Sequence, residues 1–434
     1  MKQINVGILG YGTIGAGVAE GLIKNRATIA QRTGADIVLR KIADIDIDTD
    51  RGVAVPRELL TTDARAVIAD PATDIVVELI GGTGVAYEFV CAALRAGKSV
   101  VTANKKLIAE HGAEVFALAQ QHGADIYFGA AVGGGIPIIR SLRDGLAANR
   151  IESVHAILNG TCNYILTEME RNGASFDTAL ANAQQLGFAE ADPTLDVDGY
   201  DTLHKAAILA SIAYGEIPDV NALHVEGIRG NVEAEDIKYA SDLGYRIKLL
   251  AIIKHHADTG AVELRVAPTL VHNDSMLGSV SGVFNAALVK GDLSDKTLYY
   301  GRGAGRYPTA STVIGDICDI ARRLSTGATA RVPIPPATTP IRIKPHGEIV
   351  SRYYIRLALA DKPGALASTA GVFGKHSVSI SAAMQKDLPD NTPGHATIVM
   401  LTHPARQSDI DAALAEINEL PCSGGTPRRL GIED

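Results

Sequence analysis

Three glycines near the start of the chain constrain its fold more than any other feature. Gly10, Gly12 and Gly15 follow an apolar run that ends at Leu9, and Val18 continues the apolar pattern at helical spacing. The first glycine permits a tight turn, the second lets a ligand approach the backbone, and the third lets the helix pack closely on the strand. A strand, this loop and a helix in that order predict a dinucleotide held at a helix N-terminus. The expected contacts are Gly10, Gly12, Thr13, Ile14 and Gly15.

Residues 1–135 continue as alternating strands and helices, which predicts an α/β fold with a Rossmann-type doubly wound parallel sheet. The expected strands are 4–9, 37–43, 75–80, 99–102 and 125–128. The expected helices are 14–31, 62–69, 86–96 and 111–122.

Two positions at strand ends are expected to contact the cofactor. Asp44 can accept hydrogen bonds from the ribose hydroxyls of NAD and would repel the extra phosphate of NADP. Arg40, Lys41 and Arg51 would act the other way, and the balance favours NAD. The second is the segment that follows the fourth predicted strand. Its place at a strand end of the sheet puts Lys105 near the nicotinamide. The alternative is that Lys105 is a surface lysine in a loop. The expected contacts there are Thr102, Asn104 and Lys105.

Composition excludes several classes of partner. The formal net charge of -8 argues against nucleic acid or an anionic membrane as the main partner. No apolar run is long enough to span a membrane, and no secretory signal precedes the first strand. The 4 cysteines are scattered without the spacing of a metal site or a disulfide framework, which favours reduced thiols in the cytoplasm.

The remaining 300 or so residues divide by composition into four segments. Residues 136–300 are expected to form an α+β substrate-binding and dimerisation domain, and 301–328 to return to the first domain. Gly303 lies in the returning glycine-rich loop, which either approaches the cofactor or only connects the domains. Residues 329–350 form a proline-rich linker, and 351–434 a small βαββα domain.

The segment from Gly187 to Lys205 carries the strongest chemical signal. Its carboxylates precede one lysine, and a strongly apolar helix follows. Carboxylates and an ammonium group at the edge of a buried helix suit a small zwitterion such as an amino acid. The alternative without a functional role is an exposed ion pair between Asp201 and Lys205, which would contribute only about 0.3–0.5 kcal/mol to stability. The acidic residues are Glu190, Asp192, Asp196, Asp198 and Asp201.

These motifs resemble the long bacterial form of homoserine dehydrogenase over nearly the whole chain. The matching segments are Gly10–Gly15, Thr102–Lys105, Asn159–Asn163, Gly187–Lys205 and Gly301–Gly305. The C-terminal part resembles an ACT domain, through the turn Asp361-Lys-Pro-Gly364 before a helix. The resemblance implies NAD(P)-dependent interconversion of L-homoserine and L-aspartate 4-semialdehyde in threonine, methionine and isoleucine biosynthesis. It also implies feedback regulation by L-threonine, with Asp361 and Gly364 as regulatory residues.

The resemblance also implies roles for individual residues. Lys205 is the expected proton-transfer group, with Lys105 as its partner near the nicotinamide. The substrate contacts are expected at Glu190, Asp196, Asp201, Gly160 and Thr161, with Thr161 also a candidate N-cap. The family usually has a glutamate associated with a monovalent cation such as Na⁺ where this chain has Gly129. The carbonyls of Val132, Gly134 and Ile136 are the remaining candidate ligands.

Two other functions remain open at this point. One is another amino-acid or semialdehyde dehydrogenase on the same fold, for which Cys162 would be the candidate nucleophile. The other is a non-catalytic amino-acid sensor that retains an inert cofactor domain. The resemblance further implies a homodimer or homotetramer, with a small-molecule substrate and no nucleic-acid or membrane partner.

Overall fold

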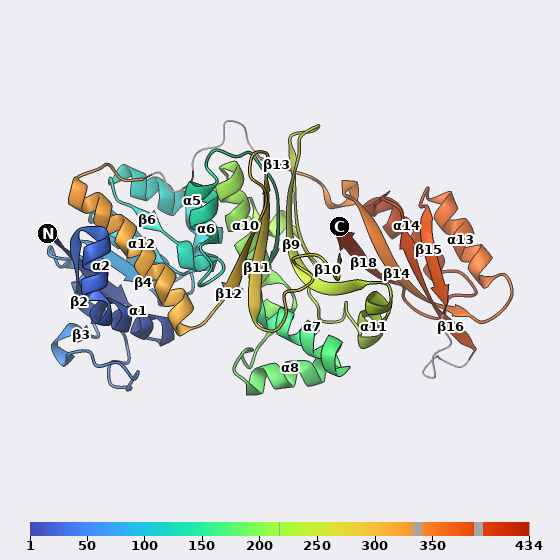
Figure 1. Ribbon diagram of the computed structural model, residues 1–434, viewed down its shortest axis with the longest axis horizontal. Helices are drawn as coiled ribbons and strands as arrows, with labels where there is room; N and C mark the ends of the chain where they lie inside the picture. The colour runs from blue at the N-terminus through green and yellow to red at the C-terminus, as the bar shows by residue number, and fades with distance from the viewer. Residues whose placement is uncertain (217, 332–333, 335–340, 386–393, 434) are drawn as a thin grey trace. The chain divides into compact units, whose positions relative to one another are not determined.

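The computed structural model describes residues 1–216, 218–331, 334, 341–385 and 394–433, which form two compact units (Figure 1). The first unit comprises Met1–Ile151, His204–Ala222 and Phe284–Ile341. The second comprises Glu152–Leu203, Leu223–Val283 and Arg342–Asp434. The expected substrate domain therefore contributes to both units, and the C-terminal part clusters with one portion of it.

A six-stranded parallel sheet in the order β3-β2-β1-β4-β5-β6 organises the first unit and confirms the Rossmann-type prediction. Its central strands are apolar on both sides, and Ile8 and Val77 are fully buried, as expected of a sheet covered on both faces. The strands are β1 (Lys2–Leu9), β2 (Ala35–Ala43), β3 (Leu60–Thr61), β4 (Ile75–Glu78), β5 (Ser99–Thr102) and β6 (Ile126–Tyr127).

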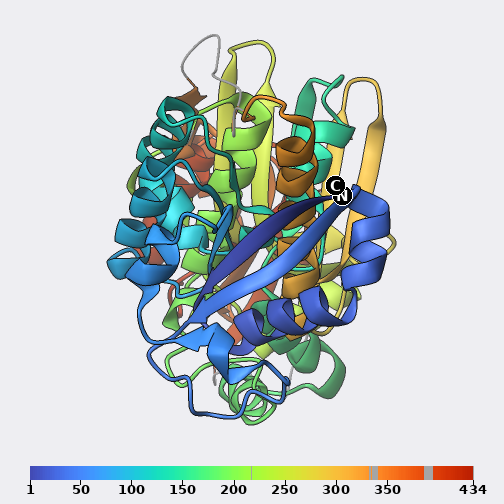
Figure 2. The same cartoon turned by 90° about the vertical axis from the view of Figure 1, so that its left-hand side faces the viewer.

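Helices cover both faces of this sheet (Figure 2). The expected helix 14–31 is divided at Asn25, and α5 begins at Lys105 rather than at residue 111. The helices of the sheet region are α1 (Thr13–Lys24), α2 (Arg26–Thr33), η1 (Arg57–Leu59), α3 (Ala64–Ala69), α4 (Val85–Arg95) and α5 (Lys105–Gln121). Short turns follow at η2 (Gly129–Ala131), α6 (Ile138–Arg140) and η3 (Ser141–Gly145).

The later part of the first unit returns to the sheet through a long helix. Helix α12 (Arg306–Thr326) packs against α1, and its Val313 and Ile317 are fully buried in the same core as β1. Helices α1 and α12 approach so closely that a Cβ added at Gly17 would lie 2.9 Å from Cγ of Arg306. The other elements of this part are η4 (Val220–Ala222), β11 (Phe284–Gly291) and β12 (Asp295–Arg302).

The second unit contains a continuous sheet in the order β7-β9-β10-β18-β14-β16-β15. Strand β18 pairs in parallel with β10 and antiparallel with β14, so it joins the C-terminal part to the rest of the unit. The predicted βαββα order therefore omitted a last strand. The strands are β7 (Ile151–Ile157), β8 (His224–Val225), β9 (Tyr245–His256), β10 (Ala261–His272), β13 (Arg342–Ile343), β14 (Val350–Ala360), β15 (Ile380–Gln385), β16 (His395–Thr402), β17 (Ala405–Arg406) and β18 (Arg428–Glu433).

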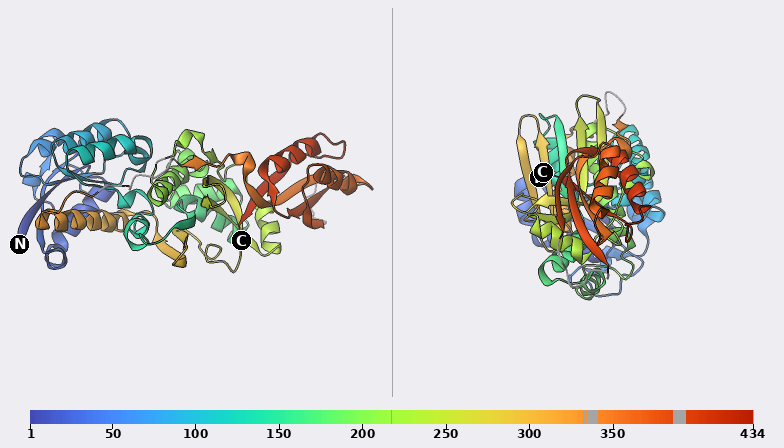
Figure 3. Two further views of the ribbon diagram at one scale, coloured as in Figure 1. Left: turned by 90° about the horizontal axis from the view of Figure 1, so that it is seen from above. Right: turned by 90° about the vertical axis from the view of Figure 1, so that its right-hand side faces the viewer.

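Two helices cover one face of the C-terminal strands (Figure 3). Phe373 of α13 and Ile410 of α14 are fully buried against Met400 of β16. The helices of this unit are α7 (Gly160–Asn172), α8 (Phe176–Gln185), α9 (Thr194–Val197), α11 (Ala234–Asp242), η5 (His346–Glu348), α13 (Ala365–Lys375) and α14 (Gln407–Asn418). Helix α10 (Tyr200–Tyr214) begins in this unit and continues into the first.

Residues 332–333 and 335–340 of the predicted linker 329–350 lie outside the described residues. Its described end is structured, because β13 pairs with β10 before η5 begins. Among the described helices, none is long and apolar enough to cross a membrane.

Candidate active site

Each of the three glycines in the first loop has a different structural role. Gly10 has a φ of 102°, and a Cβ there would lie 2.7 Å from the backbone of Leu79. A Cβ at Gly15 would lie 2.0 Å from the carbonyl oxygen of Gly10. At Gly12 an added Cβ meets no atom within 4 Å, and this residue lines a cavity of ≈ 670 Å³. Gly10 and Gly15 thus form the turn, whereas Gly12 leaves the room that a pyrophosphate needs.

Asp44 both shapes the glycine loop and lines the same cavity. Its carboxylate accepts the backbone N–H of Tyr11 and, at 2.9 Å, that of Asp46. Of the neighbouring cations, Arg51 pairs with Asp46 at 2.9 Å and Arg40 with Asp70 at 3.0 Å. The carboxylate therefore remains the group at this strand end that can meet a ribose hydroxyl.

A buried carboxylate that the sequence analysis missed organises the next two strand ends. Glu78 is fully buried and accepts the hydroxyl of Thr102 at 2.6 Å and the N–H of Gly81 at 2.9 Å. Asn104 donates to the carbonyl of Gly82 at 2.6 Å. A glutamate inside the apolar run 75–80 was the available signal. The network fixes the glycine pair beside the start of α5.

Lys105 is the first residue of α5. The predicted helix began only at residue 111, which wrongly left Lys105 in the loop before it. The side chain of Asn104 caps α5 by accepting the N–H of Leu107 at 3.1 Å, and this cap sets the helix start. Lys105 is half-buried, whereas Lys106 is exposed and lies 3.8 Å from Glu110. The two adjacent lysines therefore have different environments.

Asn159 gathers two of the acidic residues and is the N-cap of α7, a position that the sequence analysis gave to Thr161. Its amide nitrogen donates to Asp196 at 2.7 Å and to Asp201 at 2.9 Å, and its oxygen accepts the N–H of Cys162 at 2.8 Å. Asparagine is among the best N-cap residues, which was the missed signal. The Thr161 hydroxyl instead donates to the carbonyl of Phe188 at 2.5 Å. These bonds hold the acidic segment against the N-terminus of α7, which starts at Gly160.

The other acidic residues lie elsewhere. Asp198 forms a two-point ion pair with Arg229. Glu190 and Asp192 are exposed, and neither joins the cluster around Asn159 in the described contacts. The five carboxylates thus separate into two that Asn159 holds, one that is paired with Arg229, and two that face solvent.

Lys205 lies one turn after Asp201 on α10, so both side chains project from the same face of the helix. Asp201 is 5% exposed and Lys205 is half-buried, while Ala206, Ala207 and Ile208 are fully buried. An exposed i,i+4 ion pair is therefore excluded for these residues.

The thiol of Cys162 does not have the environment of a nucleophile. The residue is fully buried, and its Sγ donates to the carbonyl of Asp196 at 3.1 Å. Reactive thiols are partly exposed and lie near positive charge. The arrangement therefore gives no support to an acyl-enzyme reaction at Cys162.

The backbone around the candidate cation ligands is engaged within the protein. The carbonyl of Gly134 accepts the hydroxyl of Thr312 at 2.7 Å, and that of Ile136 accepts the N–H of Ile138 at 2.8 Å. A Cβ added at Gly134 would lie 2.4 Å from the carbonyl of Gly303, so the two glycine-rich loops are in contact. The remaining candidate, Val132, is fully buried.

A carboxylate occupies the space beside Gly129. Oδ2 of Asp316 accepts the N–H of Gly129 at 2.8 Å, and a Cβ at residue 129 would lie 2.9 Å from both carboxylate oxygens. Burial raises the pKa of Asp316 to about 7, although the Gly129 N–H and Arg143 act in the opposite direction. Asp316 therefore explains why residue 129 has no side chain.

Stability should depend on pH through Asp316. Because its folded pKa is above the unfolded value of 3.8, the contribution is complete below that value and is lost as the pH rises through about 7. Its full extent is up to about 4 kcal/mol. Asp316→Asn should keep the bond from Gly129 and remove this part of the pH dependence. Urea unfolding at pH 5, 7 and 8 measures it, and an unchanged slope in the variant would contradict the assignment.

Two glycine substitutions should separate folding from cofactor binding. Gly15→Ala overlaps the Gly10 carbonyl and should lower the unfolding free energy by about 1–3 kcal/mol. Gly12→Ala meets no protein atom, so it should fold normally but weaken nicotinamide-dinucleotide binding by roughly tenfold or more, about 1.4 kcal/mol. Thermal unfolding and nucleotide fluorescence titration measure the two effects. Tight nucleotide binding by Gly12→Ala would show that the loop does not hold the pyrophosphate.

Known proteins are similar to this chain along nearly its whole length. Residues 137–318 match the homoserine dehydrogenase family, residues 10–129 the homoserine dehydrogenase NAD-binding domain, and residues 353–422 the ACT domain. A homoserine dehydrogenase from Neisseria gonorrhoeae is 45% identical over 97% of both chains. The chain belongs to the homoserine dehydrogenase family. It is therefore an oxidoreductase with a nicotinamide-cofactor domain and a C-terminal ACT domain.

Solved structures in the family share the fold. A homoserine dehydrogenase from Thiobacillus denitrificans has a TM-score of 0.93 at 44% identity, with 100% of this chain and 99% of that chain covered. A hyperthermophilic archaeal homoserine dehydrogenase, solved in complex with NADPH, covers 73% of this chain and 97% of its own length, with a TM-score of 0.62 at 29% identity.

Proposed function

We propose that this protein interconverts L-homoserine and L-aspartate 4-semialdehyde with NAD or NADP, as a step of threonine, methionine and isoleucine biosynthesis. The observation that carries the proposal is the hydrogen-bonded group of buried Asn159, half-buried Asp196 and buried Asp201, with Lys205 one helical turn after Asp201. Asp201, one of the two carboxylates that could receive a cation, and Lys205, a possible proton-transfer group, thus lie one turn apart on helix α10. The similarity to homoserine dehydrogenases over 97% of the chain supports the choice of substrate.

Different residues are assigned to the two charged groups of the substrate. The substrate ammonium group is assigned to Asp196 and Asp201, which Asn159 holds in place. The substrate carboxylate is assigned to the N-terminus of α7 at Gly160 and Thr161, where the helix dipole favours an anion. Glu190 is exposed and is assigned only a role at the edge of this site.

Lys205 is assigned the proton transfer at the substrate oxygen. In the oxidation, Nζ of Lys205 takes the proton of the terminal hydroxyl as the C–O bond becomes a carbonyl. A nicotinamide held by the cofactor domain would supply the acceptor for the hydride of the terminal carbon. In the reverse reaction Lys205 returns the proton to the oxygen. Lys105 is assigned to orient the groups around the cofactor at the start of α5.

The cofactor site fits a dinucleotide, because Gly12 leaves open space and Asp44 lies at the end of β2. Asp44 favours NAD, since its carboxylate would repel a 2′-phosphate. The backbone carbonyls at Val132, Gly134 and Ile136 are proposed as ligands for a monovalent cation such as Na⁺. Those of Gly134 and Ile136 already accept one hydrogen bond each, so they would bind the ion through their second lone pair.

Regulation by L-threonine is assigned to the ACT domain. The turn from Asp361 to Gly364 is exposed and precedes α13, and Gly364 has a φ of 90°, which glycine adopts most readily. The edge strand β15 is also largely exposed, so it is a candidate for pairing with a second copy in a homodimer or homotetramer.

Initial rates with L-homoserine test the function directly. We expect reduction of NAD or NADP that depends on L-homoserine, and a lower rate when L-threonine is added. No turnover with either cofactor, despite nucleotide binding, would contradict the dehydrogenase. A rate unaffected by L-threonine would remove the regulatory part and leave the reaction in place.

A further inference from the structure

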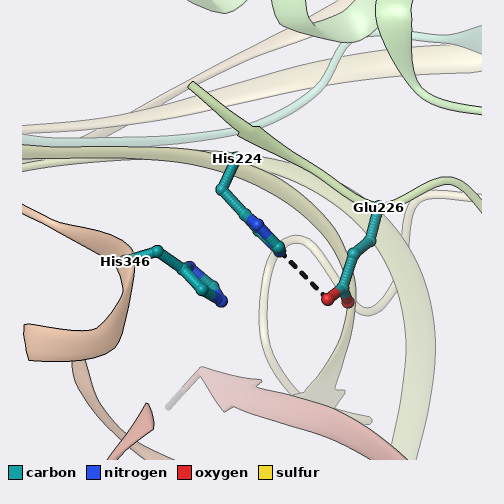
Figure 4. A group of neighbouring side chains, drawn as sticks. All are labelled: His224, Glu226 and His346. Carbon is teal, nitrogen blue, oxygen red and sulfur yellow. Dashed lines mark hydrogen bonds and ion pairs between the residues drawn. The ribbon is translucent and has the colours of Figure 1, made fainter. Parts of the chain in front are cut away.

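Three side chains of the second unit form a group that the proposed reaction does not use. His224 lies on β8, Glu226 follows that strand, and His346 begins η5. One ligand atom from each lies within 4.8 Å of the others. Figure 4 shows the two imidazole rings side by side with the Glu226 carboxylate at their edge.

The contacts in this group leave ligand positions available. Nε2 of His224 lies 3.0 Å from Oε1 of Glu226, and the rings of His224 and His346 stack with centroids 3.5 Å apart at 15°. Nδ1 of His346 is buried and has no hydrogen-bond partner in the structure. A buried polar atom without a partner is unfavourable, so a bound ligand would relieve it.

The protonation states also suit a metal. Burial lowers the pKa of His346 to about 4, and His224 and Arg429 act in the same direction, so this ring is neutral at pH 7. Burial alone would raise the pKa of Glu226, but the hydrogen bond to His224 and the charge of Arg429 together lower it to about 2. A neutral imidazole and an ionised carboxylate are the forms that bind metal ions.

We propose that His224, Glu226 and His346 form a binding site for a divalent transition-metal ion of the zinc class. Imidazole together with carboxylate selects this class over Ca²⁺ and Mg²⁺, which prefer oxygen ligands alone. Zinc–nitrogen bonds of about 2.0–2.1 Å separate tetrahedral ligands by roughly 3.4 Å. The three ligand atoms already lie within 4.8 Å of one another, and the two rings must turn out of their stacked arrangement so that one nitrogen lone pair of each points at the ion. A water completes the fourth position.

Arg429 is a nearby cation that competes for Glu226, and the structure provides it with other partners. Its guanidinium lies 2.8 Å from Oε1 of Glu226, 3.5 Å from Asp411 and 3.2 Å from the side-chain oxygen of Gln407. It can stay paired with Asp411 while Glu226 turns towards a metal. The bound ion would tie β8 to the segment that leads into β14, the first strand of the ACT domain.

Zinc titration of the full-length protein tests the site. After dialysis against a chelator, wild-type protein should bind one Zn²⁺ per chain by calorimetry. Glu226→Gln, which preserves shape, and His346→Ala should each weaken binding by at least about tenfold. His376→Ala is the matched control, because His376 lies 2.8 Å from Glu416 without a second imidazole in the pair, and it should bind Zn²⁺ like wild type.

Cobalt provides an independent readout of the same site. Co²⁺ in a four-coordinate site with imidazole ligands should give strong visible absorption in wild type and in His376→Ala, and His346→Ala should lose it. Circular dichroism checks that each variant is folded. If His346→Ala does not fold, the comparison of Glu226→Gln with wild type tests the metal site. The proposal is overturned if wild type binds no stoichiometric Zn²⁺, or if the ligand variants bind it as tightly as wild type.

Discussion

Lys205→Ala should lower kcat by roughly 10²–10⁴-fold, the range that a positioned acid or base contributes. The reason is that Lys205 is assigned the proton at the substrate oxygen and sits half-buried one turn after Asp201. Nucleotide affinity should be unchanged, because the glycine loop to which the pyrophosphate is assigned is a separate part of the chain. Stopped-flow or steady-state rates with L-homoserine, together with a nucleotide titration, measure both quantities.

Three further variants test whether the loss of activity comes from proton transfer by Lys205. Lys205→Arg keeps the charge but cannot release a proton at neutral pH, so it should be nearly as impaired as alanine. Lys106→Ala is the control, because Lys106 is exposed beside Glu110, and it should retain wild-type rates. Lys105→Ala should reduce the rate less than Lys205→Ala. A Lys205→Arg enzyme with full activity would rule out proton transfer by this residue.

Arg356→Ala should lower the unfolding free energy by about 3–5 kcal/mol, the cost of leaving a buried charge without its partner. Arg356 on β14 donates to the fully buried Asp236 at 2.6 Å and also contacts Glu233 and Glu235 around the start of α11. Without the guanidinium, Asp236 keeps only weaker donors, such as the Tyr354 hydroxyl at 3.2 Å. Urea unfolding at pH 7 measures the change.

Arg428 offers a matched control in the same cluster. It pairs with Glu233 at 2.6 Å, but the two side chains are 33% and 46% exposed, so Arg428→Ala should change stability by about 1 kcal/mol or less. The double variant Arg356→Met/Asp236→Asn should recover part of the loss, because the remaining buried group is neutral. Equal effects of Arg356→Ala and Arg428→Ala would show that burial of Asp236 is not what makes Arg356 important.

The parallel sheet was predictable because its signals are local. Apolar strands, the glycine spacing and the strand–helix alternation each act within about 30 residues, and the predicted Rossmann-type sheet was correct. Helix starts were less predictable. The cap by Asn104 moved the start of α5 to Lys105, and the cap by Asn159 replaced the expected one at Thr161.

The candidate site was predicted in composition but not in arrangement. The acidic segment identified Asp196, Asp201 and Lys205, yet nothing in the spacing distinguished these carboxylates from exposed Glu190 or from Asp198, which pairs with Arg229. Asn159 is 37 residues from Asp196 and 42 from Asp201, so its two hydrogen bonds depend on how the chain folds back.

The sequence alone determined the elements whose cause is close in the chain: a turn that requires glycine, a helix that continues an apolar stripe, and the family to which these motifs belong. Only the tertiary structure decided the long-range partners. It placed β18 between β10 and β14, set Asp316 beside Gly129, and brought His346 to His224. The physical reason is that hydrogen bonds and buried charges depend on distance in space, and residues more than a hundred positions apart become neighbours only once the core has closed.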